Sequence, residues 1–352
     1  MSSEFERALD AIRNDNNPLG RDAITGLSDP TRAETEAFAV CVAQLSDERR
    51  RELLASMVTS AEESFELEFS TLFRACLADA DAAVRRSAVE GLWEDERPGL
   101  LGNLLTMLET DPDAGVRAAV AMALGRFVYM AEGDELDEAR ADRLRSVLER
   151  VITDPSEDVE VVRRAIESIA YINDERVRGF IDRAYEHPDN RMRESAVFAM
   201  GRNADPFWTE TVLTEMREGT PAMRYEAARA SGEMQLRRAV GTLINMTREP
   251  DAQLQVMAVW ALGQIGGERV ERLLERLAAG DDEVLRTAAI DAIEEVKFAA
   301  RPMEMFVQDM DDLEFIEEHL SSDGMDDEFG QDEDDDDLDD EDDWDEDYID
   351  IG

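Results

Sequence analysis

Apolar residues recur at a fixed interval through the middle of the chain. Between residues 189 and 296 four anchor positions stand 31 residues apart: Met192, Met223, Leu254 and Leu285. Each anchor has Ala four and seven residues later, and three of the four segments have Gly nine residues later. This spacing places the anchor and both Ala residues on one face of a helix. A fixed period of this length predicts stacked supersecondary units.

The same frame extends toward the N-terminus through Val161, Val116 and Val84, which gives seven units between about residues 79 and 300. Three residues before each anchor stands Asp or, once, Thr, and these residue types cap helix N-termini. We interpret the Gly at the ninth position, as in Gly201, as the end of the first helix, because Gly adopts the left-handed conformation easily. The longer step from Val116 to Val161 predicts an inserted polar loop that begins near Ala131.

A second amphipathic helix follows the first in each unit, so a unit alone could not bury its apolar face. The pattern therefore predicts an all-α fold, a right-handed α-solenoid of stacked antiparallel helix pairs. We expect capping helices or degenerate repeats over residues 1–78 and seven repeats over 79–300. A capping or partner-binding helix is expected over residues 301–320 and a disordered acidic tail over 321–352.

The repeat strings are clearest at Asp113–Gly125, Asp189–Gly201 and Asp251–Gly263. They resemble the HEAT-repeat family, in particular the short units of phycobilisome-lyase-like proteins. The resemblance implies a ladder of ion pairs between repeats, formed by the capping Asp and by the Arg after the anchor. Val162 and Gln255 would interrupt it. The ladder residues are Asp81, Arg85, Asp113, Arg117, Asp189, Arg193, Arg224, Asp251, Asp282 and Arg286.

The charge of the chain is strongly acidic. Residues 304–352 hold 26 Asp and Glu and no Lys or Arg, and removing these charges from the total of −48 leaves −22 for residues 1–303. Of the 37 basic residues, Lys297 is the one Lys. An acidic, Lys-poor surface is typical of proteins adapted to high salt and favours a halophilic archaeon as the source. It argues against duplex DNA as a ligand, since phosphate binding needs a basic footprint.

Catalytic chemistry finds little support in the sequence. The chain has two His, His187 and His319, and neither has a neighbour at metal-ligand spacing. A related HEAT-repeat fold serves a di-iron hydroxylase with several His-Glu pairs, and this chain has no His-Glu pair. We therefore expect no enzymatic activity, cofactor, metal or small-molecule substrate. The polar N-terminus, the lack of an apolar run of about 18 residues and only two Cys, Cys41 and Cys76, predict a cytoplasmic protein without a membrane segment.

These observations predict a protein-binding scaffold or assembly factor whose partner the sequence does not name. We expect the second helix of each pair to line the concave surface, and the tail to end in apolar docking residues. The candidate partner-binding residues are Arg178, Arg183, Arg237, Arg272, Trp344, Tyr348 and Ile349. Two alternatives stay open: a chaperone or nucleic-acid mimic whose acidic tail shields a basic partner, and a lyase or hydroxylase by family analogy alone.

Overall fold

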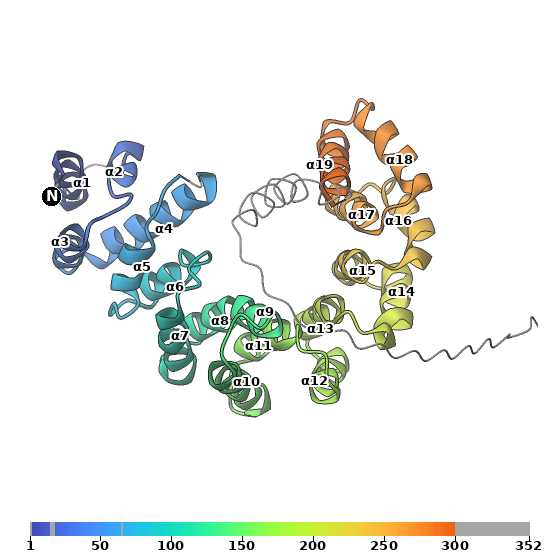
Figure 1. Cartoon of the computed structure of the whole chain (residues 1–352), viewed down its shortest axis with the longest axis horizontal. Helices are drawn as coiled ribbons and strands as arrows, with labels where there is room; N and C mark the ends of the chain where they lie inside the picture. Colours follow the sequence, from blue (N-terminus) through green and yellow to red (C-terminus); the bar gives the residue numbers. More distant parts are fainter. Residues whose placement is uncertain (1, 15–17, 65, 300–352) are drawn as a thin grey trace, which may run out of the picture. The chain divides into compact units, whose positions relative to one another are not determined.

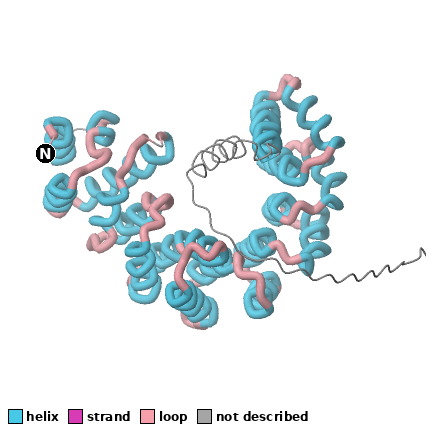
Figure 2. The backbone as a smooth tube through the Cα atoms, viewed as in Figure 1, coloured by secondary structure: helices cyan, strands magenta, loops and turns pink. Residues whose placement is uncertain are grey.

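The structure is a computed structural model that describes residues 2–14, 18–64 and 66–299. The described residues belong to one compact unit that ends at Ala299. They form helices joined by short turns, with no strand among them (Figure 2). The segments predicted over residues 301–320 and 321–352, with Trp344, Tyr348 and Ile349, lie outside the described residues.

The helices of the repeats form two layers, so the predicted all-α solenoid of helix pairs is confirmed. The first helices of the units are α6 (Ala82–Glu90), α8 (Ala114–Ala123), α11 (Val159–Ile169), α13 (Asn190–Asn203), α15 (Pro221–Glu233), α17 (Ala252–Ile265) and α19 (Glu283–Ala299). The second helices are α7 (Pro98–Thr110), α10 (Glu138–Thr153), α12 (Glu175–Tyr185), α14 (Thr209–Glu218), α16 (Val240–Met246) and α18 (Glu268–Ala278). Each first helix packs on the next one, and each second helix packs on the first helix that follows it (Figure 1).

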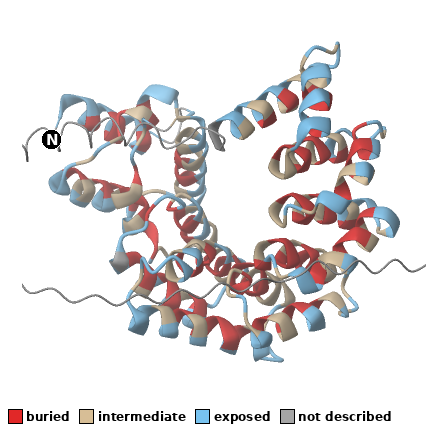
Figure 3. Ribbon diagram, turned by 45° about the vertical axis from the view of Figure 1, so that its right-hand side comes forward, coloured by how far each residue is buried: buried red, intermediate tan, exposed pale blue. Residues whose placement is uncertain are grey.

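The N-terminal part of the chain adds further helices to the same unit. These are α1 (Ser3–Arg13), α2 (Arg21–Thr25), α3 (Arg32–Val42), α4 (Asp47–Glu63) and α5 (Ser70–Cys76). Two short 3-10 helices, η1 (Pro206–Trp208) and η2 (Arg237–Ala239), lead into α14 and α16. Figure 3 shows the buried residues concentrated between the helices of the two layers, which makes the core a continuous strip along the stack.

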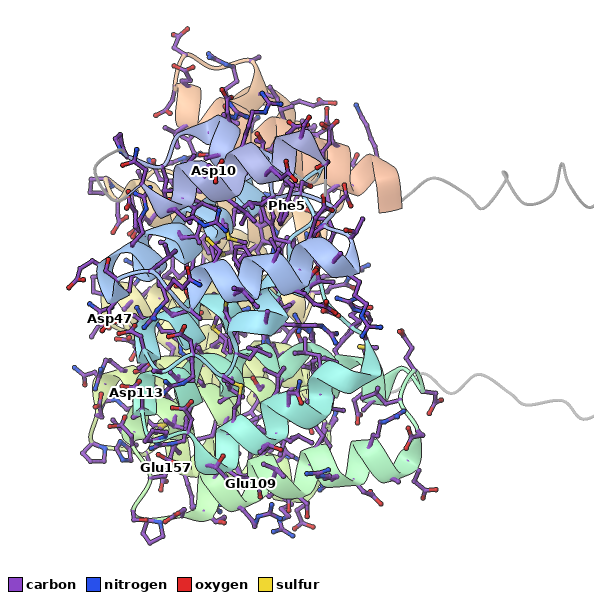
Figure 4. All side chains as sticks on the ribbon, turned by 90° about the vertical axis from the view of Figure 1, so that its left-hand side faces the viewer. Phe5, Asp10, Asp47, Glu109, Asp113 and Glu157 are labelled. Atoms are coloured by element: carbon purple, nitrogen blue, oxygen red, sulfur yellow. The ribbon has the colours of Figure 1, made fainter. Side chains whose placement is uncertain are left out.

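The period of the sequence is set by burial and capping. All seven anchors are buried, with exposed fractions between 0% for Val84 and 8% for Leu285. The capping residue before each anchor accepts a hydrogen bond from an amide of the first turn, which satisfies an otherwise unpaired donor. In the side view of Figure 4, Asp47, Asp113 and Glu157 lie along one edge, where α4, α8 and α11 begin.

The Gly at the ninth position does not end the first helix, so that expectation is wrong. Gly201 lies inside α13, and a Cβ there would come within 2.7 Å of the Cα of Ala230 in α15. This Gly is needed because the neighbouring helix passes too close for a side chain. The left-handed conformation occurs three residues later, at Ala204 (φ 53°), Gln235 (φ 51°) and Gly266 (φ 67°).

The insertion between Val116 and Val161 contains the expected polar turn, at residues 133–137, followed by α10. What the sequence did not indicate is a further helix before that turn, α9 (Gly125–Glu132), which continues from the end of α8. In the described part of the chain, Ala114–Glu132 is the one segment that is long and apolar enough to cross a membrane by length and composition. Here α8 packs between α6 and α11, and α9 packs on α10 and α11.

Candidate binding surface

The first helices present one long face away from the second helices, on the inside of the row that they form (Figure 1). We call this the inner face and define it by the positions two, six and ten residues after each anchor. Spacings of four keep these side chains in line along a helix. From α11 to α19 they are Arg163, Glu167 and Tyr171; Glu194, Phe198 and Arg202; Tyr225, Arg229 and Glu233; Val256, Trp260 and Gln264; and Thr287, Asp291 and Glu295.

Aromatic rings and guanidinium groups stack on one another across α13 and α15. The guanidinium carbon of Arg229 lies 3.5 Å from the centre of the Phe198 ring, and that of Arg202 lies 4.4 Å from the same centre. Arg202 also lies 4.9 Å from the centre of the Tyr171 ring. Cation–π contacts of this kind hold the planar groups in place. Burial lowers the pKa of Arg202, a sign that this part of the face is poorly solvated.

Two carboxylates accompany this stack on α15. Arg229 donates to Glu226 over 3.0 Å and is also paired with Glu233. Burial raises the pKa of both carboxyl groups, and their attraction to Arg229 only partly offsets it. One oxygen of Glu233, Oε2, is buried without a hydrogen-bond partner.

The α11 part of the inner face neutralises its own charge. Arg163 donates to Glu160 over 2.6 Å, and Arg164 donates to Glu167 over 2.8 Å. Glu167 also accepts the hydroxyl hydrogen of Ser195 from α13, so the network joins two repeats. Because each guanidinium has a carboxylate beside it, this region offers little net charge to a ligand.

Toward the C-terminal end the inner face contains two grooves, and most carboxylates beside them have no ion-pair partner among the described residues. One groove of about 690 Å³ is lined by residues of α13, α15, α17 and α19, including Glu194, Tyr225 and Val256. A second groove of about 470 Å³ lies over α17 and α19, with Trp260 and Asp291 in its wall. The grooves adjoin, since both include Val256 and Val284.

Groups suited to covalent or metal chemistry do not gather on this face. Among residues 2–14, 18–64 and 66–299, no three His, Cys, Asp or Glu side chains lie together as they would to hold a metal ion. Cys41 and Cys76 are free and buried. Burial raises the pKa of Cys76 to about 12 and also raises that of Cys41, which leaves both thiols protonated at neutral pH.

Comparison with known families agrees with this architecture. A family model described as HEAT repeats matches residues 70–153 and 209–294. The chain is a HEAT-repeat protein. No curated protein matches it significantly in sequence.

The solved structures to which this chain is similar are distant in sequence. The complex of CpcE and CpcF of phycocyanin lyase from Nostoc sp. PCC7120 is 19% identical, with 76% of this chain and 96% of that chain covered and a TM-score of 0.48. YibA from E. coli is 15% identical, with 84% and 97% covered and a TM-score of 0.39. Human deoxyhypusine hydroxylase is 16% identical, with 84% and 97% covered and a TM-score of 0.33. At these identities the likeness concerns the fold alone.

The Arg residues after the HEAT anchors do form ion pairs, but with different acids from those expected. Arg85 donates to Asp111 over 2.7 Å and Arg224 donates to Glu249 over 2.8 Å, and each acid stands two residues before the next cap. Arg117 donates to Glu157 over 2.6 Å. The capping Asp residues accept hydrogen bonds from amides of their own helices, as Asp113 does from the amide of Val116, and Asp81 also pairs with Arg51 of α4.

Two Arg residues of the expected ladder, Arg193 and Arg286, have no carboxylate partner among the described residues. Arg193 donates to the carbonyl oxygen of His187 over 3.1 Å, and Arg286 donates to that of Gly280 over 3.4 Å. Both contacts join the Arg to the turn that precedes its own helix. Asp189, Asp251 and Asp282 act as caps there.

The predicted partner-binding Arg residues lie in the outer layer. Arg178 pairs with Asp205 over 2.7 Å, and Arg183 lies over the Phe180 ring, both on α12. Arg237 belongs to η2, and Arg272 on α18 pairs with Glu268 over 3.6 Å. The expectation that second helices line the concave side is therefore wrong, because the first helices occupy it (Figure 1).

Sequence reasoning missed the inner-face residues although the repeat frame contained them. From one HEAT repeat to the next the anchor stays apolar, and the positions four and seven residues later stay small or apolar. The positions two, six and ten residues after the anchor vary freely and include Phe198, Arg229 and Trp260. Large, changing residues at fixed places in a repeat are the signal that distinguishes an exposed functional face from the core.

Proposed function

We propose that this HEAT-repeat protein is a non-enzymatic scaffold that binds other proteins through the inner face. The observation that carries the proposal is a row of partly buried aromatic side chains at inner-face positions of successive repeats: Phe198, Tyr225 and Trp260. Aromatic and Arg residues are enriched in the energetically important centres of protein interfaces. HEAT repeats offer such residues along an extended surface, as repeat proteins that bind partners do.

Site-specific photo-crosslinking tests which layer makes the contact. A photoreactive phenylalanine analogue replaces Phe198 or Trp260 on the inner face, or Phe207, which is 61% exposed beside Arg178 in the outer layer. Each variant is expressed in the source organism and irradiated. We expect crosslinked proteins from the two inner positions and not from Phe207.

The opposite pattern, with crosslinks from Phe207 alone, would assign binding to the outer Arg residues and refute the proposal. Absence of crosslinks from all three positions in several growth states would argue against a scaffold. The far-UV circular dichroism spectrum of each variant serves as the folding control.

The acidic tail supports a second candidate, the shielding of a basic partner by residues 321–352. Residues 304–352 carry 26 acidic and no basic side chains, which attracts a cationic surface over a Debye length. Deleting residues 321–352 separates the candidates, since the scaffold proposal expects partner binding to persist. We also propose a cytoplasmic location and adaptation to high salt; a melting temperature that is unchanged between low salt and molar KCl would contradict the adaptation.

A further inference from the structure

The two adjoining grooves over α15, α17 and α19 combine an apolar floor with an acidic rim. Tyr225, Val256, Trp260 and Val284 contribute apolar surface, and Val284 is 52% exposed. Six carboxylate side chains and no Arg or Lys line the same grooves: Glu194, Glu226, Asp251, Glu283, Asp291 and Glu295.

Most of this rim has no internal counter-charge. Glu226 is paired with Arg229, and Asp251 caps α17. The other four, Glu194, Glu283, Asp291 and Glu295, form no ion pair within the described residues. The α11 region differs, because its Arg residues neutralise its acids. The negative potential of the inner face is therefore concentrated where the apolar floor is exposed.

We infer that this pair of grooves binds a segment of a partner protein in which bulky apolar side chains alternate with Lys or Arg. The inference rests on the proposed scaffold function and identifies the class of its partner. Apolar side chains of the segment would cover Val256, Trp260 and Val284, and its cations would meet the unpaired carboxylates. Complementary charge of this kind speeds association and rejects wrong partners.

Charge disfavours the other occupants. The chain's own residues 304–320 contain Phe306, Met310 and Leu313 but also seven Asp or Glu and no Lys or Arg, so the rim would repel them. A second copy of a chain with a net charge of −48 meets the same obstacle.

Fluorescence anisotropy with labelled peptides and the full-length protein tests the inference, at the lowest salt at which the protein remains fully helical. The main probe carries Leu and Phe interspersed with Arg. One comparison peptide replaces Arg by Glu, one replaces Leu and Phe by Ser, and one has the sequence of residues 304–320. We expect the first peptide to bind most tightly and to weaken in molar KCl.

Matched variants place the binding in the groove. Asp291→Lys with Glu295→Lys reverses two exposed rim charges one turn apart, and Glu271→Lys with Glu275→Lys makes the same change on α18, away from the grooves. The first pair should weaken binding about tenfold, and the second less than about twofold. Val284→Ser should weaken it about fivefold, while Val40→Ser, at a 61% exposed site on α3, should not.

Equal losses in both charge-reversal pairs would mean diffuse attraction to an acidic protein and would overturn the inference. So would equal affinity for the Ser-substituted peptide, or tighter binding of the acidic peptide or of residues 304–320. If no peptide binds but inner-face crosslinks to a partner are found, the partner class is wrong and the scaffold proposal stands. If neither appears, both fail.

Discussion

Adding one methyl group at Gly201 tests whether close contact between first helices holds the stack together. The Cβ of Gly201→Ala would lie 2.7 Å from the Cα and 2.9 Å from the Cβ of Ala230, so α13 and α15 must move apart. Overpacking of this kind costs about 1–3 kcal/mol. Ala is favoured over Gly inside a helix by about 0.5–1 kcal/mol, which offsets part of that cost. We expect a net loss of about 1–2 kcal/mol in the free energy of unfolding.

The control is Gly102→Ala in α7, where an added Cβ would meet nothing within 4 Å. Only the helix-propensity gain applies there, so this variant should be stabilised by about 0.5–1 kcal/mol. Urea unfolding followed by circular dichroism measures both. If Gly201→Ala is stabilised as much as Gly102→Ala, the first helices have room to spare and the reasoning is refuted.

Three further predictions concern capping, charge and pH. Asp111→Asn leaves the buried Arg85 without its anion and should lower the free energy of unfolding by about 3 kcal/mol, as measured by urea unfolding. The double variant Arg85→Met with Asp111→Leu should lower it by less than either single change, because no buried charge is left unpaired. Gln235 has a left-handed backbone conformation that is costly for a residue with a Cβ, so Gln235→Gly should raise the free energy of unfolding by up to about 1 kcal/mol. The control Gln264→Gly, within α17, should lower it by a similar amount. Amides of Ser2 and Thr31 and the Thr31 hydroxyl lower the pKa of Glu34 to about 2, so the stability that it contributes is complete above its unfolded pKa and is lost as pH falls toward 2. Melting temperatures between neutral pH and pH 3 should fall less steeply for Glu34→Gln than for the wild type, with Glu36→Gln as the exposed control.

The repeat architecture could be predicted because burial and capping leave a regular mark on the sequence. An anchor such as Met192 must be apolar to fill the strip between layers, and Asp189 must accept the amides of the first turn. Both demands recur once per repeat, so the period and the fold class follow from them.

The layer that faces inward was predicted wrongly, although the sequence held the information. Small residues such as Ala196, Ala199 and Gly201 let first helices approach one another closely, whereas second helices carry Leu and Val. In a curved double row, the layer with the closer spacing lies inside.

The ion-pair partners could not be derived from spacing alone. Asp111 and Asp113 lie only two residues apart, so spacing does not choose between them as the partner of Arg85, and local geometry decides. Asp113 is engaged by the amide of Val116, which leaves Asp111 to meet the guanidinium. Burial alone would raise the pKa of Asp111, but bonds from Arg85 and from the amide of Asp113 lower it overall.

The contact between each Gly and the Ala of the next first helix also sets a minimum spacing between the side chains of the inner face. Gly201 meets Ala230, Gly232 meets Ala261 and Gly263 meets Ala292, each within 3 Å of an imagined Cβ, so these neighbours cannot slide closer. Bending of the stack must then be taken up by the outer helices, which touch one another less. A ligand that lies along Phe198, Arg229 and Trp260 would therefore meet side chains whose spacing cannot shrink, and its own spacing would have to match theirs.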